Sequence, residues 1–362
     1  MFRAVTRYGK LLFIPWFVLM LAMVGTFFAW KQQQRILVSQ VRVQFEHEID
    51  RTRTSILSNV SFYEDVLWNM RSLLASNGDL SYADWAQFVN ELAIEQTYPG
   101  IVGVGVVEYV SAESAEQFVG MLRQNGLPSY ELHHHAHHGD IYAVKYADSS
   151  MHQMGMMGID IKGHPTLRLA AEHARDNGDS AISAKVMLSD WVGEHSAGGE
   201  GHSDSAEMEQ SHTVDHGSAE TMNIADDNHP ELDAGFFIFQ PFYRSDMPLH
   251  SAKDRQAALV GWVYMIVNSH DLMHSIIGLD TSLIHFEIFD GDEPIDEAML
   301  FNHATGIHDS HVVTEREHIS ILVGGRRWTL EFGKLPAFVE LVNQSTPLLT
   351  AIGGSAISLA CV

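Results

Sequence analysis

The sequence predicts an α+β fold with antiparallel sheets, preceded by a membrane-spanning helix. The residues are 46% hydrophobic and 19% charged, which is typical of a chain that folds. Helical patterns dominate the first part of the chain, whereas β-branched and aromatic runs gather after residue 235. Because few helices separate those late strands, antiparallel pairing is favoured over a doubly wound parallel sheet.

The composition excludes several classes of protein. Lys and Arg number 22 against 46 Asp and Glu, a net charge of −24 that would repel nucleic acid. The only cysteine is Cys361, which excludes an internal disulfide framework and a cysteine-based zinc site. No GxSxG, HExxH, P-loop or paired-carboxylate motif is present in the sequence. We therefore expect neither an enzyme active site nor a cofactor in this chain.

A membrane span is predicted at the N-terminus. Leu11 to Trp30 is free of charge, and its length matches the hydrocarbon core of a bilayer. Arg3, Arg7 and Lys10 precede it, so the positive-inside rule places residues 1–10 in the cytoplasm. A cleaved signal peptide is the alternative, but the run is too long and no small-residue cleavage site follows it. We expect an inner-membrane protein whose following residues are exported.

The other end of the chain predicts the start of a second span. Residues 346–362 are uncharged and mostly apolar, so we expect a span that is cut short and continues beyond Val362. A buried C-terminal helix is the alternative, which Gly353 and Gly354 disfavour. With two spans, the region between them would be a single periplasmic or extracellular body.

A long stalk helix is predicted within residues 31–80. Apolar residues recur there at spacings of three, four and seven, which defines one stripe along a helix. The stripe consists of Phe45, Ile49, Ile56, Val60, Tyr63, Leu67, Met70 and Leu74. It suits a helix that packs on the body of the protein, and equally the seam of a homodimer.

Caps and β-branched runs mark the next elements. Ser81 with Asp84 is typical of a helix start, and we expect that helix to continue toward Gln96. Ile101 to Val110 is a buried strand, in which glycines leave part of one face bare. Ser114 with Gln117 predicts a capping box for another helix.

The remaining elements follow from the same signals. Pro165 and Gly178 bracket a helix. Its expected packing face is Leu167, Ala170, Ala171 and Ala174. Further strands are predicted at 236–243, 258–267, 284–289, 319–323 and 327–332.

Two segments break the composition and raise a metal-binding alternative. Leu132 to His138 holds five His in seven residues. Residues 193–233 hold eleven acidic residues and five His but no Lys or Arg, so we expect a disordered insertion there. Histidine binds Zn(II), Ni(II) and Cu(II), so a membrane-tethered periplasmic metal-binding protein is an alternative function. The candidate ligands are His133, His134, His135, His137, His138, His212 and His216. A closed site needs four fixed ligands, and we therefore predict no specific metal site.

Several short motifs, in order, resemble the CHASE domain over about residues 75 to 340. They are Tyr98-Pro99-Gly100, Gly158-Ile159-Asp160, Pro165-x-x-Arg168, Gly235-Phe236-Phe237, Gly261-Trp262-Val263 and Gly325-Arg326-x-Trp328. The resemblance implies a long stalk helix and two PAS-like lobes, a membrane-distal lobe at 81–270 and a proximal lobe at 271–345. It also implies a ligand-sensing input module that signals to a cytoplasmic histidine kinase or cyclic-di-GMP enzyme.

The resemblance further implies a small-molecule ligand bound in the distal lobe. In plant cytokinin receptors, which belong to that family, an Asp in an Asp-x-Tyr-Ala stretch binds adenine, and Asp140-Ile141-Tyr142-Ala143 is similar to it. The bulky Tyr264-Met265 pair replaces small glycines of those receptors, so we expect a different ligand. The candidate ligand-binding residues are Asp140, Tyr142, Ser183, Phe237, Phe239 and Tyr264.

Overall fold

The structure is a computed structural model of the 362-residue chain. It describes residues 5–76, 80–133, 139–149, 155–191, 233–277, 284–303 and 316–334. The predicted insertion at 193–233, except Asp233, and the predicted second span at 346–362 lie outside the described residues.

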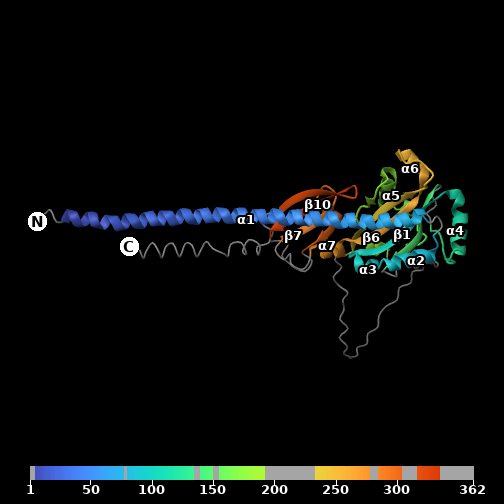
Figure 1. Cartoon of the computed structure of the whole chain (residues 1–362), viewed down its shortest axis with the longest axis horizontal. Helices are drawn as coiled ribbons and strands as arrows, with labels where there is room; N and C mark the ends of the chain where they lie inside the picture. Colours follow the sequence, from blue (N-terminus) through green and yellow to red (C-terminus); the bar gives the residue numbers. More distant parts are fainter. Residues whose placement is uncertain are drawn as a thin grey trace, which may run out of the picture.

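A single helix, α1 (Val5–Ser76), forms the N-terminal part of the molecule. Its 72 residues span about 108 Å at 1.5 Å per residue, and it runs alongside both sheets (Figure 1). The predicted stripe is confirmed, because its residues from Phe45 to Met70 are buried and Leu74 is partly buried against the same core. Within the described part of the chain, no helix has both the length and the apolar character that a membrane crossing requires.

The first sheet is antiparallel, with strand order β2-β1-β6-β5-β3 and with β4 paired to β5. Its strands are β1 (Ile101–Val110), β2 (Ile141–Ser149), β3 (Ala181–Ile182), β4 (Val186–Met187), β5 (Ala234–Tyr243) and β6 (Leu259–Asn268). The predicted strand at 101–110 is confirmed residue for residue, and β5 is buried along its whole length. A strand covered on both faces can be apolar along nearly its whole length, and β5 is apolar apart from the buried Gln240.

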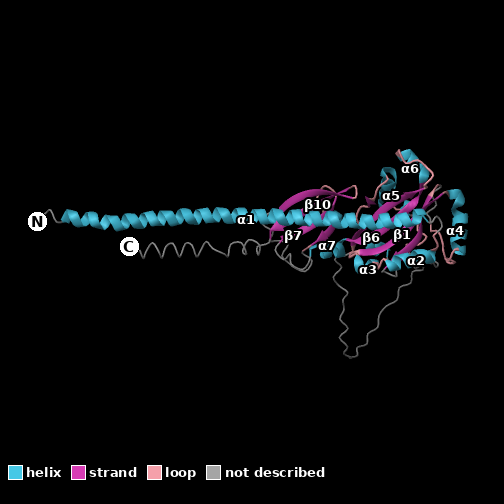
Figure 2. Cartoon of the chain, viewed as in Figure 1, coloured by secondary structure: helices cyan, strands magenta, loops and turns pink. Residues whose placement is uncertain are grey.

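A second antiparallel sheet has the strand order β8-β7-β10-β9. Its strands are β7 (Ile284–Asp290), β8 (Met299–Asn302), β9 (Arg316–Val323) and β10 (Arg326–Lys334). The second sheet lies closer than the first to the N-terminal end of α1 (Figure 2). Both sheets confirm the predicted α+β class with antiparallel pairing.

The helices of the body are short. They are α2 (Tyr82–Glu91), α3 (Ile94–Thr97), α4 (Ala115–Gln124), α5 (Pro165–Asn177), α6 (Ala252–Ala258) and α7 (Ser269–Ile277). The described residues also include the 3-10 turns η1 (Ala112–Ser114), η2 (Ile161–Gly163), η3 (Leu188–Trp191) and η4 (Asp296–Ala298). The start of α5 at Pro165 and its end before the left-handed Gly178 are confirmed.

Two predicted helix signals need correction. Ser81 caps α2 as expected, but the helix does not continue to Gln96, because Ala93 adopts a left-handed conformation and separates α2 from α3. Ser114 makes no side-chain cap for α4. It ends the 3-10 turn η1 instead, and its hydroxyl bonds to Ser111, so the predicted capping box with Gln117 is wrong.

Two hydrophobic cores lie on opposite faces of the first sheet. Phe236 and Ile238 on β5 belong to the core that includes the buried stripe of α1 and the inner face of the second sheet. Phe237 and Phe239 belong to the other core, which the buried face of α5 covers. This alternation follows from the period of two along a strand. The candidate site lies on the α5 side.

Candidate functional site

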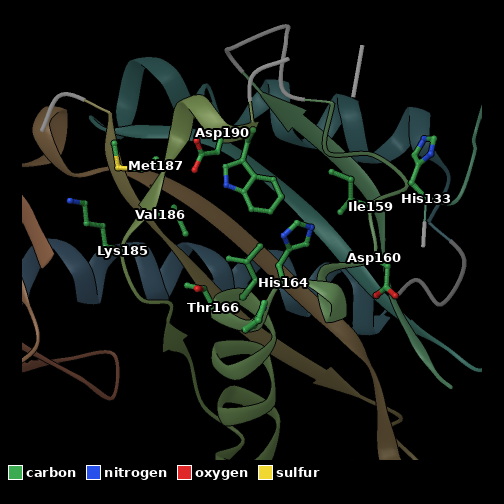
Figure 3. A pocket seen from close by; sticks show the side chains of 12 residues that line it. His133, Ile159, Asp160, His164, Thr166, Lys185, Val186, Met187 and Asp190 are labelled. Atoms are coloured by element: carbon green, nitrogen blue, oxygen red, sulfur yellow. The ribbon is translucent and has the colours of Figure 1, made fainter. Parts of the chain in front are cut away.

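A pocket of about 660 Å³ opens on the α5 side of the first sheet (Figure 3). Three separate segments form its wall: His133, the stretch from Ile159 to Leu167, and the stretch from Lys185 to Trp191. The lining residues are His133, Ile159, Asp160, His164, Pro165, Thr166, Leu167, Lys185, Val186, Met187, Asp190 and Trp191.

Asp160 fixes one side of the pocket. Its Oδ1 accepts hydrogen bonds from the backbone N–H groups of Tyr142 and Lys162, each at 3.0 Å, so it joins η2 to the start of β2. The residue is only 6% exposed. Two backbone donors on one carboxylate fix the orientation of the side chain. Asp160 is therefore held in a fixed position at the pocket wall.

Aromatic rings form another part of the wall. The ring of Trp191, on η3, lies 4.8 Å from the ring of His164 and 5.8 Å from that of Phe237, measured between centroids. Phe239 and Tyr264 continue this layer beneath Phe237, at centroid distances of 5.9 Å each. Trp191 thus separates the pocket from a buried aromatic layer on β5 and β6.

The charged side chains around the pocket differ in whether they bond to other parts of the protein. The ammonium group of Lys185 donates to the carbonyl of Glu297 at 3.1 Å, outside the pocket wall. Asp160 and the exposed Asp190 remain on the wall as acidic groups. Carboxylates accept N–H donors, and Trp191 offers an apolar face, so the pocket can hold a small polar molecule that contains a ring.

The structure places Asp140 and Tyr142 beside the pocket rather than in its wall. The Oδ2 of Asp140 accepts a hydrogen bond from the Tyr109 hydroxyl at 2.6 Å, and its carbonyl accepts one from Lys162 at 2.7 Å. The hydrogen bond to Asp140 and then burial raise the pKa of Tyr109 to about 12. The ring of Tyr142 packs on Trp262 at 4.8 Å.

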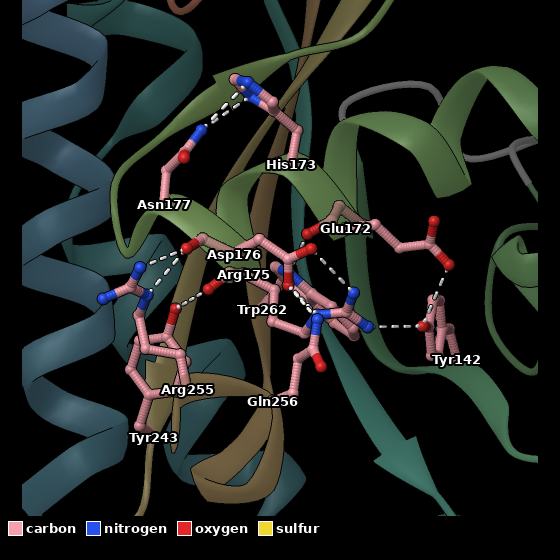
Figure 4. A network of polar contacts seen from close by, with 11 residues as sticks. Tyr142, Glu172, His173, Arg175, Asp176, Asn177, Tyr243, Arg255, Gln256 and Trp262 are labelled. Carbon is pink, nitrogen blue, oxygen red and sulfur yellow. Dashed lines mark hydrogen bonds and ion pairs between the residues drawn. The ribbon is translucent and has the colours of Figure 1, made fainter. Parts of the chain in front are cut away.

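Tyr142 also takes part in a polar network around α5 (Figure 4). Its hydroxyl accepts a hydrogen bond from Arg175 at 3.2 Å, and burial raises its pKa to about 12. The hydroxyl of Tyr243 donates to the carbonyl of Arg175 at 2.7 Å, and Arg255 donates to the carbonyl of Asp176 at 2.8 Å. These contacts hold α5, and with it one wall of the pocket, against strands β2 and β5.

The hydroxyl of Ser183 both donates and accepts a hydrogen bond within the protein. The hydroxyl accepts the N–H of Phe237 at 2.9 Å and donates to the carbonyl of Ala184 at 2.8 Å. The residue is 1% exposed. In this arrangement Ser183 positions the chain between β3 and β4 against β5.

Tyr264 fills the space that a glycine leaves open in the neighbouring strand. Gly105 on β1 pairs with Tyr264, and a Cβ on Gly105 would lie 2.5 Å from the tyrosine ring. The bare strand face predicted from the sequence is therefore occupied by a side chain of the protein. Burial raises the pKa of Tyr264 above its usual range.

None of the six predicted residues lines the pocket described here. Asp160 and Pro165 belong to motifs that resemble the CHASE domain, but the sequence did not predict that they line a ligand pocket. The stretch from Lys185 to Trp191 carries no motif, and only the folded sheet brings it near α5. Sequence reasoning therefore missed this part of the wall.

The metal-binding alternative finds no support in the described residues, where no three His, Cys, Asp or Glu side chains lie close enough to hold an ion. Of the seven histidines considered, His133 lies at the pocket. The other six lie outside the described residues.

Comparison with known proteins agrees with the resemblance found in the sequence. The family model of the CHASE domain matches residues 78–198 and 213–301, more than half of the chain. The matched region contains the whole first sheet and the pocket, whereas β9 and β10 follow it. A search of curated proteins finds no match. The chain therefore belongs to the CHASE domain family, the extracytoplasmic, non-catalytic sensory modules of signalling receptors.

Proposed function

We propose that this chain is the ligand-sensing input module of a membrane-bound receptor, and that its ligand binds in the pocket beside α5. The pocket is the observation that carries this proposal. Its volume of about 660 Å³ falls within the roughly 300–1,000 Å³ of small-molecule sites. The two sheets then correspond to two PAS-like lobes, with ligand bound on the lobe at 81–270 and the lobe at 271–345 nearer the membrane.

The ligand that suits this wall is a small polar compound with a ring. Trp191 provides an apolar face for the ring, and Asp160 and Asp190 provide acceptors for its N–H groups. A cytokinin held on the sheet itself is disfavoured, because Tyr264 occupies the space over Gly105. The six residues predicted from the sequence act mainly by shaping the aromatic layer and holding α5.

A membrane anchor at Leu11 to Trp30 is part of the proposal. Large apolar side chains are exposed along this part of α1, in contrast to the buried stripe that begins at Phe45. They are Trp16, Phe17, Met20, Leu21, Met23, Val24, Phe27 and Phe28. An apolar surface of this size is unfavourable in water and favourable in lipid. We place the N-terminus in the cytoplasm, the sensory body outside the inner membrane, and the output in a cytoplasmic histidine kinase or cyclic-di-GMP enzyme.

A homodimer would have to use another side of α1. The predicted stripe packs on the protein's own core and is not available to a partner. Phe62 and Trp68 lie on the outward side and are 50% and 47% exposed. A second copy that contacts the stalk is therefore proposed to meet these residues.

Ligand binding can be tested by thermal unfolding of the full chain against small polar ring compounds, cytokinins included. Thr166→Trp fills the pocket, and Leu169→Trp, at an exposed position of the same helix outside the pocket, is the matched control. A true ligand at 100 times its Kd stabilises the fold by about 2.7 kcal/mol. We expect this stabilisation in the wild type and in Leu169→Trp, and its loss in Thr166→Trp.

One outcome would argue against the proposed site, and another against the exclusion of cytokinins by Tyr264. Equal stabilisation of Thr166→Trp and the wild type would place binding outside this pocket. Strong stabilisation by a cytokinin at low concentration would show that Tyr264 does not prevent adenine binding.

A further inference from the structure

We infer that the segment from Ser180 to Met187 is a mechanical link that couples occupancy of the pocket to the second sheet. This inference rests on the proposed function, since it assumes that the pocket holds the signal. The segment includes β3 and β4 and reaches the pocket, the second sheet and α1 within eight residues.

At one end, the segment forms part of the pocket. Lys185, Val186 and Met187 lie in its wall. Val186 and Met187 form β4 and pair with only two residues of β5, Gly235 and Ala234. A two-residue strand at a sheet margin is held by few hydrogen bonds, so a ligand that presses on it can displace it more easily than a central strand.

Lys185 connects this wall directly to the second sheet. Its backbone N–H donates to Oδ2 of Asp290, the last residue of β7, at 2.9 Å. The carboxylate of Asp290 is only 4% exposed, and Arg326 at the start of β10 binds both of its oxygens. A charged, bidentate pair has a well-defined geometry, so movement of Lys185 is passed to the ends of two strands.

A second contact joins the segment to the turn between β9 and β10. The N–H of Ile182 donates to the carbonyl of Gly324 at 3.1 Å. Gly324 has a φ of +51°, and a Cβ there would lie 2.4 Å from the side chain of Ile182. Gly324 therefore bonds to the backbone of Ile182 and lies against its side chain, with no room for a side chain of its own.

The segment also has a fixed point and a contact with the stalk. Ser183 bonds to Phe237 in both directions, since its N–H donates to the Phe237 carbonyl at 2.8 Å and its hydroxyl accepts the Phe237 N–H at 2.9 Å. The hydroxyl of Ser180 donates to Glu64 on α1 at 2.5 Å. Because the segment is short and held at Ser183, a displacement of Lys185 to Met187 would also shift its other contacts. These are the contacts with β7, with the β9–β10 turn and with α1.

Position between two sites does not by itself demonstrate coupling, so the test measures coupling directly. Thr166→Trp serves as a substitute for ligand in the full chain, and Leu169→Trp is the control outside the pocket. The measurement is amide hydrogen exchange at Gly324 to Arg326 in detergent-solubilised protein. We expect Thr166→Trp to change those exchange rates by about fivefold or more, the low end of typical coupling between sites, and Leu169→Trp to leave them unchanged.

The link itself is tested by combining Thr166→Trp with Asp290→Asn, which weakens the pair with Arg326. We expect the exchange response at Gly324 to Arg326 to be largely lost. Arg326→Lys keeps the charge but not the bidentate geometry, so it should reduce the response even if Asp290→Asn fails to fold.

Wild-type exchange rates at Gly324 to Arg326 in Thr166→Trp would overturn the inference. A full change in those exchange rates in both combined variants would also overturn it. Because this experiment uses no ligand, its result is independent of whether any compound binds. A compound that binds the pocket, together with no response to Thr166→Trp, would leave the proposed function standing and reject the link alone.

Discussion

Gly105 shows how one residue sets the shape of the first sheet. A Cβ at this position would lie 2.3 Å from the carbonyl oxygen of Tyr146 and 2.5 Å from the ring of Tyr264. The carbonyl belongs to the neighbouring strand β2 and cannot move without breaking the pairing. The glycine is thus required for close packing of β1 against β2 and of Tyr264 over β1.

Gly105→Ala is therefore expected to lower the free energy of unfolding by about 1–3 kcal/mol, as overpacking does in other cores. Gly120→Ala is the control, since Gly120 lies in α4 and a Cβ there meets nothing within 4 Å. The control should stabilise the helix by up to about 1 kcal/mol. Chemical denaturation measures both, and wild-type stability of Gly105→Ala would contradict the packing described here.

Ser183 allows a structural role to be separated from ligand binding. Ser183→Ala removes the acceptor for the buried N–H of Phe237 and should cost about 1–3 kcal/mol of stability. Ser61→Ala, on an exposed position of α1, should cost little. Denaturation is the measurement, with affinity for any identified ligand as the second readout. Loss of affinity with unchanged stability would show instead that Ser183 binds the ligand, as the sequence predicted.

At the scale of elements, α7 and β8 bring several histidines together beneath the second sheet. The rings of His270 and His274 on α7 lie 4.3 Å apart, and both lie near Phe301 on β8. Burial, followed by neighbouring histidines, lowers the pKa of His270 and of His303. Asp271 acts in the opposite direction on His270 but does not reverse the shift.

These shifts predict a loss of stability in mild acid. In the unfolded chain a histidine takes up a proton near its ordinary pKa of about 6.5, whereas folded His270 and His303 take it up only at lower pH. Between those two pKa values the unfolded state binds more protons, so stability falls as the pH decreases from about 6.5. Above that range the two histidines contribute no pH dependence.

His270→Gln and His303→Gln should each flatten the dependence of Tm on pH between about 7 and 5, relative to the wild type. Replacement of the exposed His250 in the same way serves as the control and should leave the slope unchanged. An equally steep slope in His270→Gln and His303→Gln would show that other groups cause the acid sensitivity.

Elements whose signals are local could be predicted from the sequence. Pro165 and Gly178 bound α5 because a fixed φ favours the helix start and a left-handed residue ends it. β2 was missed, since its apolar residues alternate with Lys145 and Asp148 directly after a polar, His-rich stretch. The Ser114 cap failed because a 3-10 turn precedes α4, and a sequence pattern does not distinguish that turn from a helix start.

The pocket could not be predicted from local sequence patterns, because it depends on which strands lie next to each other. Its wall combines His133, the start of α5 and the segment after β3, which the strand order β2-β1-β6-β5-β3 brings to one face. The sequence marked the aromatic residues Phe237 and Phe239 but could not show that Trp191 would cover Phe237. The predicted aromatic residues therefore lie on the same face of the first sheet as the pocket, but not in its wall.

At the scale of the whole molecule, α1 connects the two sheets to the exposed apolar segment at its N-terminal end. The helix contacts β5 and β6 of the first sheet, α7, and β9 of the second sheet. Because one continuous helix touches both sheets, a change in their relative arrangement would alter how α1 packs on them (Figure 1). In a receptor, that change would reach the membrane through the same helix.

We propose a sensory body that lies on the far side of the membrane from the N-terminus. Cysteine labelling tests it directly, because the chain has a single cysteine, Cys361, which can be replaced by Ser. A cysteine is then introduced by Asp246→Cys, in an exposed turn after β5, or by Thr6→Cys near the N-terminus. In intact cells a membrane-impermeant maleimide should label Asp246→Cys, and should label Thr6→Cys only after permeabilisation. Labelling of Asp246→Cys only after permeabilisation would instead place the body on the cytoplasmic side, in contradiction to the proposed topology.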